Sequence, residues 1–293
     1  MKPYSVCLIG SSHTNGLFQA WKNRTFPVGR DFSLTFFAAA GGRLRSLRHE
    51  NGILISEDDR ARDMLVRTSG GKDRIVASEY DAIVIYAFGL RFADDMLEFC
   101  RRYGTAEHQK YGPIETLLSG DCFTASATAI LAQSGAIEYL ASLRTVYRSP
   151  ILVCPTPLPP SEVIEEEFSE SRFSEPVFLC SVLGRFTHAV SSLCAKHGGE
   201  VVWQDESTIE SPCFTKDAFG LGSTGFTGKQ REGYNKHLNE DFGALALGGL
   251  LARLDELSGG RVLQRAGETE VPVGAGAVNG VSLEIQSGMQ IRE

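Results

Sequence analysis

The chain lacks several features that would assign it to a specialised class of protein. Its apolar runs all fall short of the roughly 18 residues of a transmembrane helix, and the run after Lys2 is too short for a signal-peptide core. The seven cysteines are scattered, odd in number and without a Cys-x-x-Cys pair, which is typical of reduced thiols. The net charge of −7 gives no electrostatic support for binding nucleic acid or an anionic membrane. We therefore expect a cytoplasmic globular protein with neither of these partners.

Metal-ligand spacing is also missing. Four histidines show no two-ligand spacing with an acidic partner, so neither a metal site nor a cofactor is expected; they are His49, His108, His188 and His197. Hydrophobic residues make up 42% of the chain and charged residues 22%, which are ordinary globular values. A length of 293 residues allows one large α/β domain or two smaller ones.

The stretch from Val6 to His13 is the most informative part of the sequence. Val6 to Ile9 is a short apolar run typical of a strand buried on both faces, and Gly10 then allows a tight turn. Ser11, Ser12 and His13 precede an amphipathic helix, so the Ser12 hydroxyl is expected beside backbone N–H groups at a helix start. Such donors bind an anion or a developing oxyanion. An ordinary strand-to-helix turn with a serine cap is the alternative.

Strands alternate with helices along the chain, which predicts a parallel sheet with helices on both faces. We expect a flavodoxin-like three-layer α/β/α fold, with functional loops at the carboxyl ends of the strands. The five expected strands lie near residues 5–9, 33–38, 82–87, 151–154 and 200–203.

The segments between these strands are predicted with less regular patterns. Residues 52–78 are expected to form a β-hairpin insert, and 125–147 one long helix. A short helix is expected over 43–49 and another helix over 93–103. Residues 104–122 and 204–233 are expected to be long loops that set specificity.

An ordered set of motifs then resembles the SGNH (GDSL-like) hydrolase superfamily. These motifs are Ile9-Gly10-Ser11-Ser12, Gly41-Gly42, Gly89-Leu90-Arg91 and His237-Leu238-Asn239. The resemblance implies Ser12 as the nucleophile, His237 as the general base, and an oxyanion hole made by the N–H groups of Ser12 and Gly42. It also implies one hydrolase-like domain over 1–260, followed by a C-terminal extension over 261–293.

Two positions depart from the family pattern. Arg91 stands where the family has its oxyanion asparagine, and Tyr234 where it has the aspartate that orients the histidine. Arg91 is expected to donate to the oxyanion or to grip a substrate anion. The pocket is expected to be lined by Ser11, His13, Gly41, Gly89, Arg91, Tyr234 and Asn239.

Two functions remain open at this point. In the first, a Ser12–His237 pair hydrolyses or transfers the acyl or acetyl group of a small-molecule or carbohydrate ester. In the second, the same fold is a non-catalytic anion- or glycan-binding module. The sequence decides neither the substrate, nor hydrolysis against transfer, nor the oligomeric state.

Overall fold

The structure is a computed structural model that describes residues 2–40, 42–210, 213–223 and 237–259. The elements below belong to one compact unit, Met1–Val262. The predicted extension over 261–293 lies outside the described residues and stays a prediction.

Five parallel strands form the central sheet in the order β10-β9-β6-β1-β2. Numbered along the chain within this sheet, the order is 2-1-3-4-5, as in flavodoxin-like folds. The predicted fold class is therefore confirmed. The strands are β1 (Tyr4–Gly10), β2 (Phe32–Ala38), β6 (Ala82–Tyr86), β9 (Ile151–Cys154) and β10 (Glu200–Val201).

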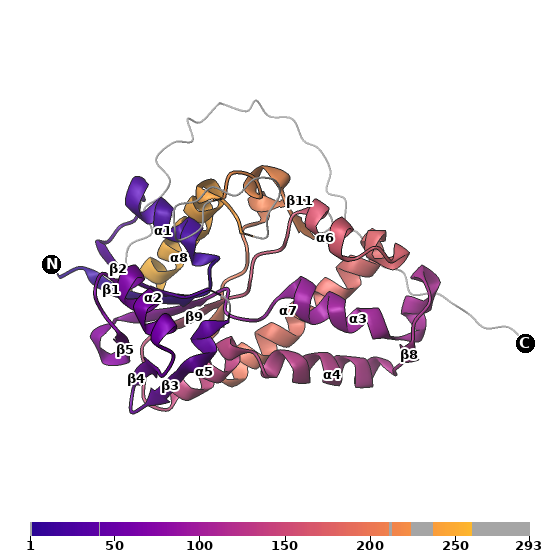
Figure 1. The fold of residues 1–293 in the computed structure, drawn as a ribbon, viewed down its shortest axis with the longest axis horizontal. Coiled ribbons are helices and arrows are strands. Elements are labelled where there is room, and N and C mark those ends of the chain that lie inside the picture. Colours follow the sequence, from indigo (N-terminus) through magenta and orange to yellow (C-terminus); the bar gives the residue numbers. More distant parts are fainter. Residues whose placement is uncertain (1, 41, 211–212, 224–236, 260–293) are drawn as a thin grey trace, which may run out of the picture. The chain divides into compact units, whose positions relative to one another are not determined.

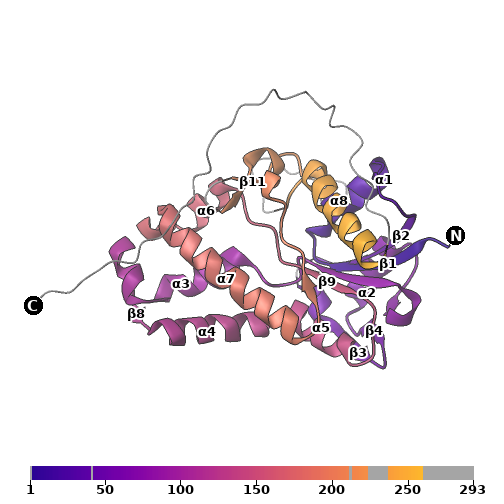
Figure 2. The same cartoon turned by 180° about the vertical axis from the view of Figure 1, so that it is seen from behind.

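Alternate residues of the strands enter two separate cores, one on each face of the sheet. Val6 and Leu8 of β1 pack under α1 (Thr14–Asn23) and α8 (Glu240–Leu257). Cys7 and Ile9 face the opposite core, which includes α5 (Gly135–Arg144) and α7 (Pro176–Lys196). Figures 1 and 2 show these helices on the two sides of the sheet. This two-sided burial explains why the strands read as continuous apolar runs.

The predicted β-hairpin insert over 52–78 contains a helix that the sequence reading missed. Its strands belong to a three-stranded antiparallel sheet of β3 (Leu47–Glu50), β4 (Ile53–Ser56) and β5 (Arg74–Val76). Between β4 and β5 lies α2 (Asp59–Ser69), capped by Asp58, whose side chain accepts from the N–H groups of Arg60 and Ala61. Only two α2 residues are buried, so its apolar pattern is short. The predicted helix over 43–49 is a 3₁₀ turn followed by β3.

Two predicted helices are also corrected. The segment 125–147 forms α4 (Gly120–Ala132) and α5, which Ser134 separates by capping α5. The segment 93–103 begins as a π-helix, Phe92–Leu97, and continues as α3 (Glu98–Arg102). The remaining elements are short: β7 (Tyr103–Gly104), β8 (Thr116–Leu117), α6 (Ser161–Glu167), β11 (Ile209–Glu210) and β12 (Phe214–Thr215).

Helix α7 is long and apolar enough to cross a membrane by length and composition alone. In the structure, Phe178, Val182 and Phe186 lie on its buried face and belong to the larger core. Figure 2 shows α7 beside α4. The core contacts account for its apolar residues.

Candidate active site

The Ser12 turn lies at the point where the strand order of the sheet reverses, between β1 and β6. Gly10 ends β1 opposite Tyr86, and a Cβ on Gly10 would lie 2.5 Å from the Tyr86 carbonyl oxygen. Only glycine therefore allows the two strand ends to approach so closely. The Ser11 carbonyl accepts from both the N–H and the hydroxyl of Thr14, which starts α1 two residues after Ser12. The local sequence thus holds Ser12 at a helix start, in the crevice where such folds bind ligands.

Close packing of α1 on α8 brings the His237 segment to this turn. A Cβ on Gly243 would lie 2.2 Å from the backbone carbonyl of Gly16, and a Cβ on Gly16 would lie 2.8 Å from the Asn239 carbonyl oxygen. The backbones of α1 and α8 are therefore in direct contact where the two helices cross. His237 precedes the α8 cap by two residues and Ser12 precedes Gly16 by four, so this contact sets their separation.

Ser12 Oγ and His237 Nε2 are 2.6 Å apart, in a partly buried position. This is the contact predicted from the sequence, whereas the catalytic roles of the two side chains stay predictions. The ring of His13 stacks on the ring of His237, with centroids 4.7 Å apart and planes 17° apart. A hydroxyl in direct contact with an imidazole nitrogen is the arrangement in which histidine can take the serine proton.

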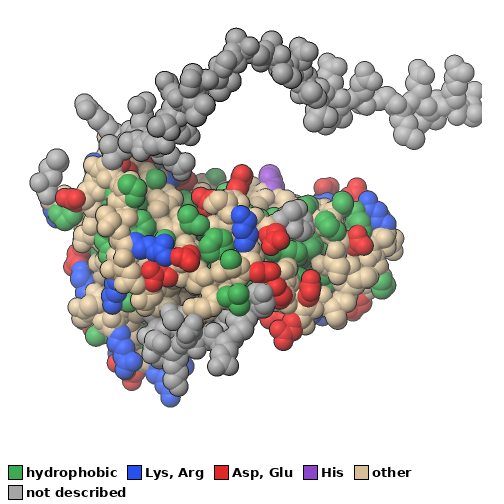
Figure 3. All heavy atoms as spheres, turned by 90° about the horizontal axis from the view of Figure 1, so that it is seen from above, with side chains coloured by type: hydrophobic (Ala, Val, Ile, Leu, Met, Phe, Trp, Pro, Cys, Tyr) green, Lys and Arg blue, Asp and Glu red, His purple; other side chains and the backbone are tan. Residues whose placement is uncertain are grey.

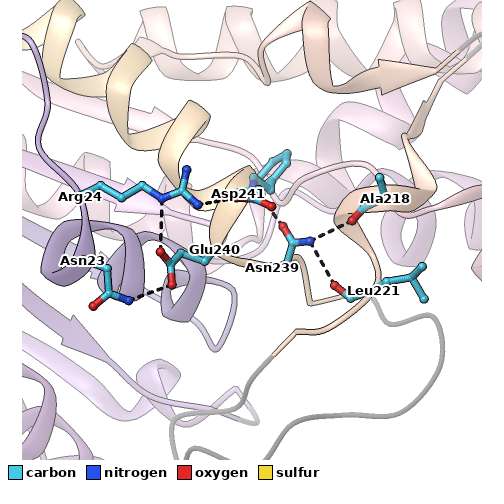
Figure 4. A network of polar contacts seen from close by, with 8 residues as sticks. Asn23, Arg24, Ala218, Leu221, Asn239, Glu240 and Asp241 are labelled. Atoms are coloured by element: carbon cyan, nitrogen blue, oxygen red, sulfur yellow. Dashed lines mark hydrogen bonds and ion pairs between the residues drawn. The ribbon is translucent and has the colours of Figure 1, made fainter.

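Asn239 is engaged by the protein itself and does not line an open site. Its Oδ1 accepts from the Phe242 N–H and caps α8, while its Nδ2 donates to the carbonyls of Ala218 and Leu221 (Figure 4). These contacts are evidence for a structural role of Asn239 and against its predicted substrate-binding role, which stays a prediction. The side chain anchors the start of α8, and with it His237, to the 218–221 segment.

Ion pairs next to this cap also join the two helices. Arg24, directly after α1, pairs with Glu240 and Asp241 in the first turn of α8, and Asn23 donates to Glu240 (Figure 4). Exposed pairs of this kind contribute modestly to stability. They add to the glycine contact in holding α1 against α8.

Gly42 lies in the turn after β2, the strand that pairs with β1. Ala38 ends β2 opposite Gly10, and the Ala39 N–H donates to the Gly10 carbonyl. Gly42 has a φ of +69°, which disfavours any larger residue, and a Cβ there would have no atom within 4 Å. The position is compatible with the predicted oxyanion role, which stays a prediction. Gly41 lies outside the described residues.

The turn after β6 contains three residues in the left-handed region: Ala87, Gly89 and Leu90, with φ of 49°, 79° and 56°. Such conformations are costly for non-glycine residues and recur at functional sites. Gly89 packs on α5, because a Cβ there would lie 2.9 Å from Ser134 Cβ. The close contact is evidence for a packing role of Gly89 and against its predicted substrate-binding role.

Arg91 forms ion pairs within its own turn. Its two terminal nitrogens lie 2.7 Å from an Asp94 oxygen and 2.8 Å from an Asp95 oxygen, and its backbone N–H also donates to Asp95. One guanidinium between two carboxylates leaves a net charge of −1. These ion pairs weigh against the predicted roles as oxyanion donor and anion grip, since a second anion there would meet local negative charge. Both roles stay predictions.

A shallow pocket of about 40 Å³ lies between the Ser12 turn and the segment after β9. His13, Arg91, Asp94, Thr156 and Pro157 are among its lining residues. Of the other predicted pocket residues, Ser11 lies in the turn itself and Tyr234 lies outside the described residues.

Sequence reasoning missed two features of the site. Gly16 and Gly243 set the approach of α1 and α8, and the only signal in the sequence was a glycine near each helix start. The His13–His237 stack joins residues far apart in the sequence, and nothing in the pattern pointed to it.

Comparisons with known proteins find likenesses of fold at low identity. No family model and no curated protein matches the chain. An extracellular lipase from Streptomyces rimosus is 14% identical, with a TM-score of 0.42 over 85% of this chain and 98% of that one. A lipase/acylhydrolase from Enterococcus faecalis is 10% identical, with a TM-score of 0.37 over 89% and 99%. The periplasmic domain of a Salmonella Paratyphi A lipopolysaccharide acetyltransferase is 12% identical, with a TM-score of 0.35 over 86% and 84%.

Proposed function

We propose that this chain is a divergent SGNH-type serine esterase or acyl transferase. The observation that carries the proposal is the 2.6 Å contact between Ser12 Oγ and His237 Nε2 at the carboxyl edge of the sheet. Histidine accepts the serine proton, the serine oxygen attacks the ester carbonyl, and an acyl-enzyme forms as the alcohol leaves with that proton. Water or an acceptor hydroxyl then takes the acyl group.

The oxyanion of this reaction requires donors, and the ion pairs of Arg91 with Asp94 and Asp95 favour other groups for that role. In the proposal the backbone N–H groups of Ser12 and Gly42 supply the donors, because their turns follow neighbouring strands. The non-catalytic alternative depended on Arg91 to grip an anion, and the ion pairs with Asp94 and Asp95 weigh against it. The cytoplasmic location and the small-molecule or carbohydrate ester remain part of the proposal.

Turnover of p-nitrophenyl acetate by the full chain tests the proposal. Ser12→Ala should lower kcat at least about 10³-fold, since it removes the nucleophile. Ser142→Ala is the matched control, because Ser142 also lies within 2.6 Å of a histidine nitrogen, and this variant should retain activity. Equal activity in the wild type and Ser12→Ala, or no turnover of any ester, would contradict the proposal.

A further inference from the structure

Three basic side chains lie close together among the helices on the side of the molecule where Figure 1 shows α3, α4 and β8, away from β1 and β2. Arg172 belongs to the 3₁₀ helix before α7, Arg185 to α7 itself, and His108 to the 3₁₀ helix between β7 and β8. The His108 ring lies 5.2 Å from the Phe123 ring between centroids, and the Arg185 guanidinium carbon lies 5.4 Å from the same ring. Burial lowers the pKa of His108, and the nearby charges of Arg185 and Arg172 lower it further.

Arg172 is a buried cation without a carboxylate partner in the described part of the chain. The residue is 4% exposed, and its two terminal nitrogens donate to the backbone carbonyls of Pro113 and Arg101. Its Nε is buried and has no hydrogen-bond partner among the described residues. The acidic residue nearest to it along the chain, Glu170, pairs with Arg101. Because a buried charge is costly unless an opposite charge compensates it, Arg172 requires a negative group that the described residues do not supply.

His108 adds a buried hydrogen-bond donor. The residue is 2% exposed, and its Nδ1 accepts from the Thr105 N–H at 3.4 Å, so the hydrogen-bond network assigns the proton to Nε2. That Nε2 atom is buried and has no partner within the described ranges. An unsatisfied buried N–H group costs free energy, which an acceptor oxygen would recover. The site therefore lacks an acceptor as well as a negative charge.

Arg185 supplies the second positive charge and the accessible side of the site. Its Nη1 donates to Thr124 Oγ1 at 3.0 Å, no described carboxylate lies within ion-pair distance of it, and both residues are partly exposed. Other arginines differ: Arg91, Arg101 and Arg253 each contact two carboxylates. On the molecular face drawn in Figure 3, Lys and Arg side chains likewise lie beside those of Asp and Glu. The absence of a carboxylate is therefore a property of this site rather than of arginines in this chain generally.

The neighbouring titratable groups do not neutralise the two arginines. The charges of Arg172 and Arg185 act on the thiol of Cys100, but burial outweighs them and raises the pKa of Cys100 to about 12, so the thiol is neutral. Glu107, next to His108, is exposed, so water screens its charge. A water molecule in the site would accept from the N–H groups and would leave both positive charges uncompensated. An anion satisfies both requirements.

We propose that the arginine–histidine cluster, defined by His108, Arg172 and Arg185, binds a free inorganic oxyanion, phosphate or sulfate. Guanidinium N–H groups match the oxygens of such an ion in geometry, and hydrogen bonds between charged groups are the strong ones. Because His108 and Arg172 are almost fully buried, the ligand is a small ion rather than a larger phosphate ester. The bound ion would join α7 to the two 3₁₀ helices and stabilise this part of the fold, independently of ester chemistry.

Calorimetric titration of the full chain with inorganic phosphate, at constant ionic strength, tests the site. Binding should be saturable, with one ion per chain. Arg185→Gln should weaken it at least about 10-fold, because one of the two compensated charges is lost. Arg148→Gln is the matched control, since it removes an exposed arginine whose side chain donates to the Arg144 carbonyl, and it should bind as the wild type does. No saturable binding, or an equal affinity in the two variants, would overturn the proposal.

A measurement on the unaltered chain locates the ion without any variant. The ring ¹⁵N signals of His108 should shift on addition of phosphate and saturate at the calorimetric Kd, because Nε2 gains an acceptor. The signals of His49 should stay unchanged, since both of its ring nitrogens have protein partners. Unchanged His108 signals in a chain that binds phosphate would place the ion elsewhere and overturn the proposal.

Two further ligands define what the site takes. Glycerol phosphate should bind at least about 10-fold more weakly than inorganic phosphate, because its organic part does not fit an enclosed site. Equal affinity would overturn the assignment of a free inorganic ion. Potassium chloride at the same ionic strength should not shift the His108 signals as phosphate does. An equal response to chloride would show a general salt effect and would overturn the oxyanion site.

Discussion

Two serine–histidine contacts in this chain have the same length and differ in chemistry. Ser12 Oγ lies 2.6 Å from His237 Nε2, and Ser142 Oγ lies 2.6 Å from His49 Nδ1. His49 Nε2 accepts a hydrogen bond from the Gly52 N–H at 3.1 Å, so the hydrogen-bond network assigns the proton to Nδ1. His49 therefore donates to Ser142 and cannot take its proton. A short distance alone does not identify a nucleophile.

The surroundings of the two serines differ as well. Ser142 lies in the last turns of α5, where the helix presents carbonyl oxygens and disfavours an anion. Ser12 precedes α1, where the helix presents N–H donors. The Ser142–His49 contact ties the β3–β4 turn to α5 and is structural. The Ser12–His237 contact lies where an oxyanion can be stabilised.

The largest expected effect is the loss of kcat on replacing His237, which replacement of His49 should not cause. His237→Ala should lower kcat for p-nitrophenyl esters at least about 10³-fold, because the general base is removed. His49→Ala should leave kcat unchanged and lower the free energy of unfolding by roughly 1 kcal/mol, since it leaves two partly buried hydrogen-bond partners unsatisfied. Ester kinetics and urea unfolding of both variants check the pair. A loss of kcat in His49→Ala, with kcat retained in His237→Ala, would show that the assignment of the His49 proton to Nδ1 does not identify the structural contact.

The second largest effect on kcat is expected for Gly243→Ala, because this variant changes the helix contact that positions His237. The new Cβ would lie 2.2 Å from Gly16 backbone atoms, so α1 and α8 must move apart. A displacement of about 1 Å at the reacting pair can cost about 10²-fold in kcat. Gly248→Ala on the same helix is the control, since its Cβ lies 3.9 Å from Phe26. Unchanged kcat in a folded Gly243→Ala variant would count against this contact as the positioning device.

His13 should have a smaller effect as a positioning residue for His237. Loss of a stacked ring is expected to cost about 0.5–1.5 kcal/mol, or about 2- to 10-fold in kcat, with KM unchanged. His13→Ala should show this loss and His13→Phe should restore most of kcat. Steady-state kinetics of the two variants make the comparison. Equal losses in both would mean that stacking is not what His13 contributes.

Arg91→Ala should change kcat and KM by less than about 5-fold, the range of an exposed ion pair. The same kinetic assay decides the matter, with Lys72→Ala as a control at another exposed ion pair. A fall of about 10² in kcat would restore the oxyanion role, and a similar rise in KM would restore the anion-gripping role.

The last effect concerns stability alone. Burial lowers the pKa of both His49 and His108 in the folded chain. Below the ordinary histidine pKa of about 6.5, the unfolded chain therefore binds more protons, and acidification favours unfolding. The urea midpoint should fall between pH 7.5 and pH 5.5, and it should fall less in His49→Gln than in His188→Gln, where the side chain is exposed. An equal fall in both variants would remove His49 from this account.

The sheet was predictable because its strands are buried on both faces. Ala82–Tyr86 and Ile151–Cys154 read as unbroken apolar runs, and glycine or proline marks where several of these strands end. Helix α2 was not predictable from its two buried residues, and the break at Ser134 was hidden by apolar residues on both sides.

The site was predictable only in part. Motif order predicted the Ser12–His237 contact, because loops after parallel strands meet at one edge. The ion pairs of Arg91 were not predicted, although Asp94 and Asp95 stand at i+3 and i+4, the spacing of a helical ion pair. The pattern favoured a loop there, whereas the chain enters a π-helix at Phe92.

Labelling with a fluorophosphonate, followed by peptide mass spectrometry, tests the central claim most directly. The reagent reacts with a serine only where a base and oxyanion donors activate it. The account predicts one adduct, on Ser12, that is lost in His237→Ala and retained in His49→Ala. No adduct on the folded chain, an adduct on Ser142, or a Ser12 adduct that survives His237→Ala would contradict it.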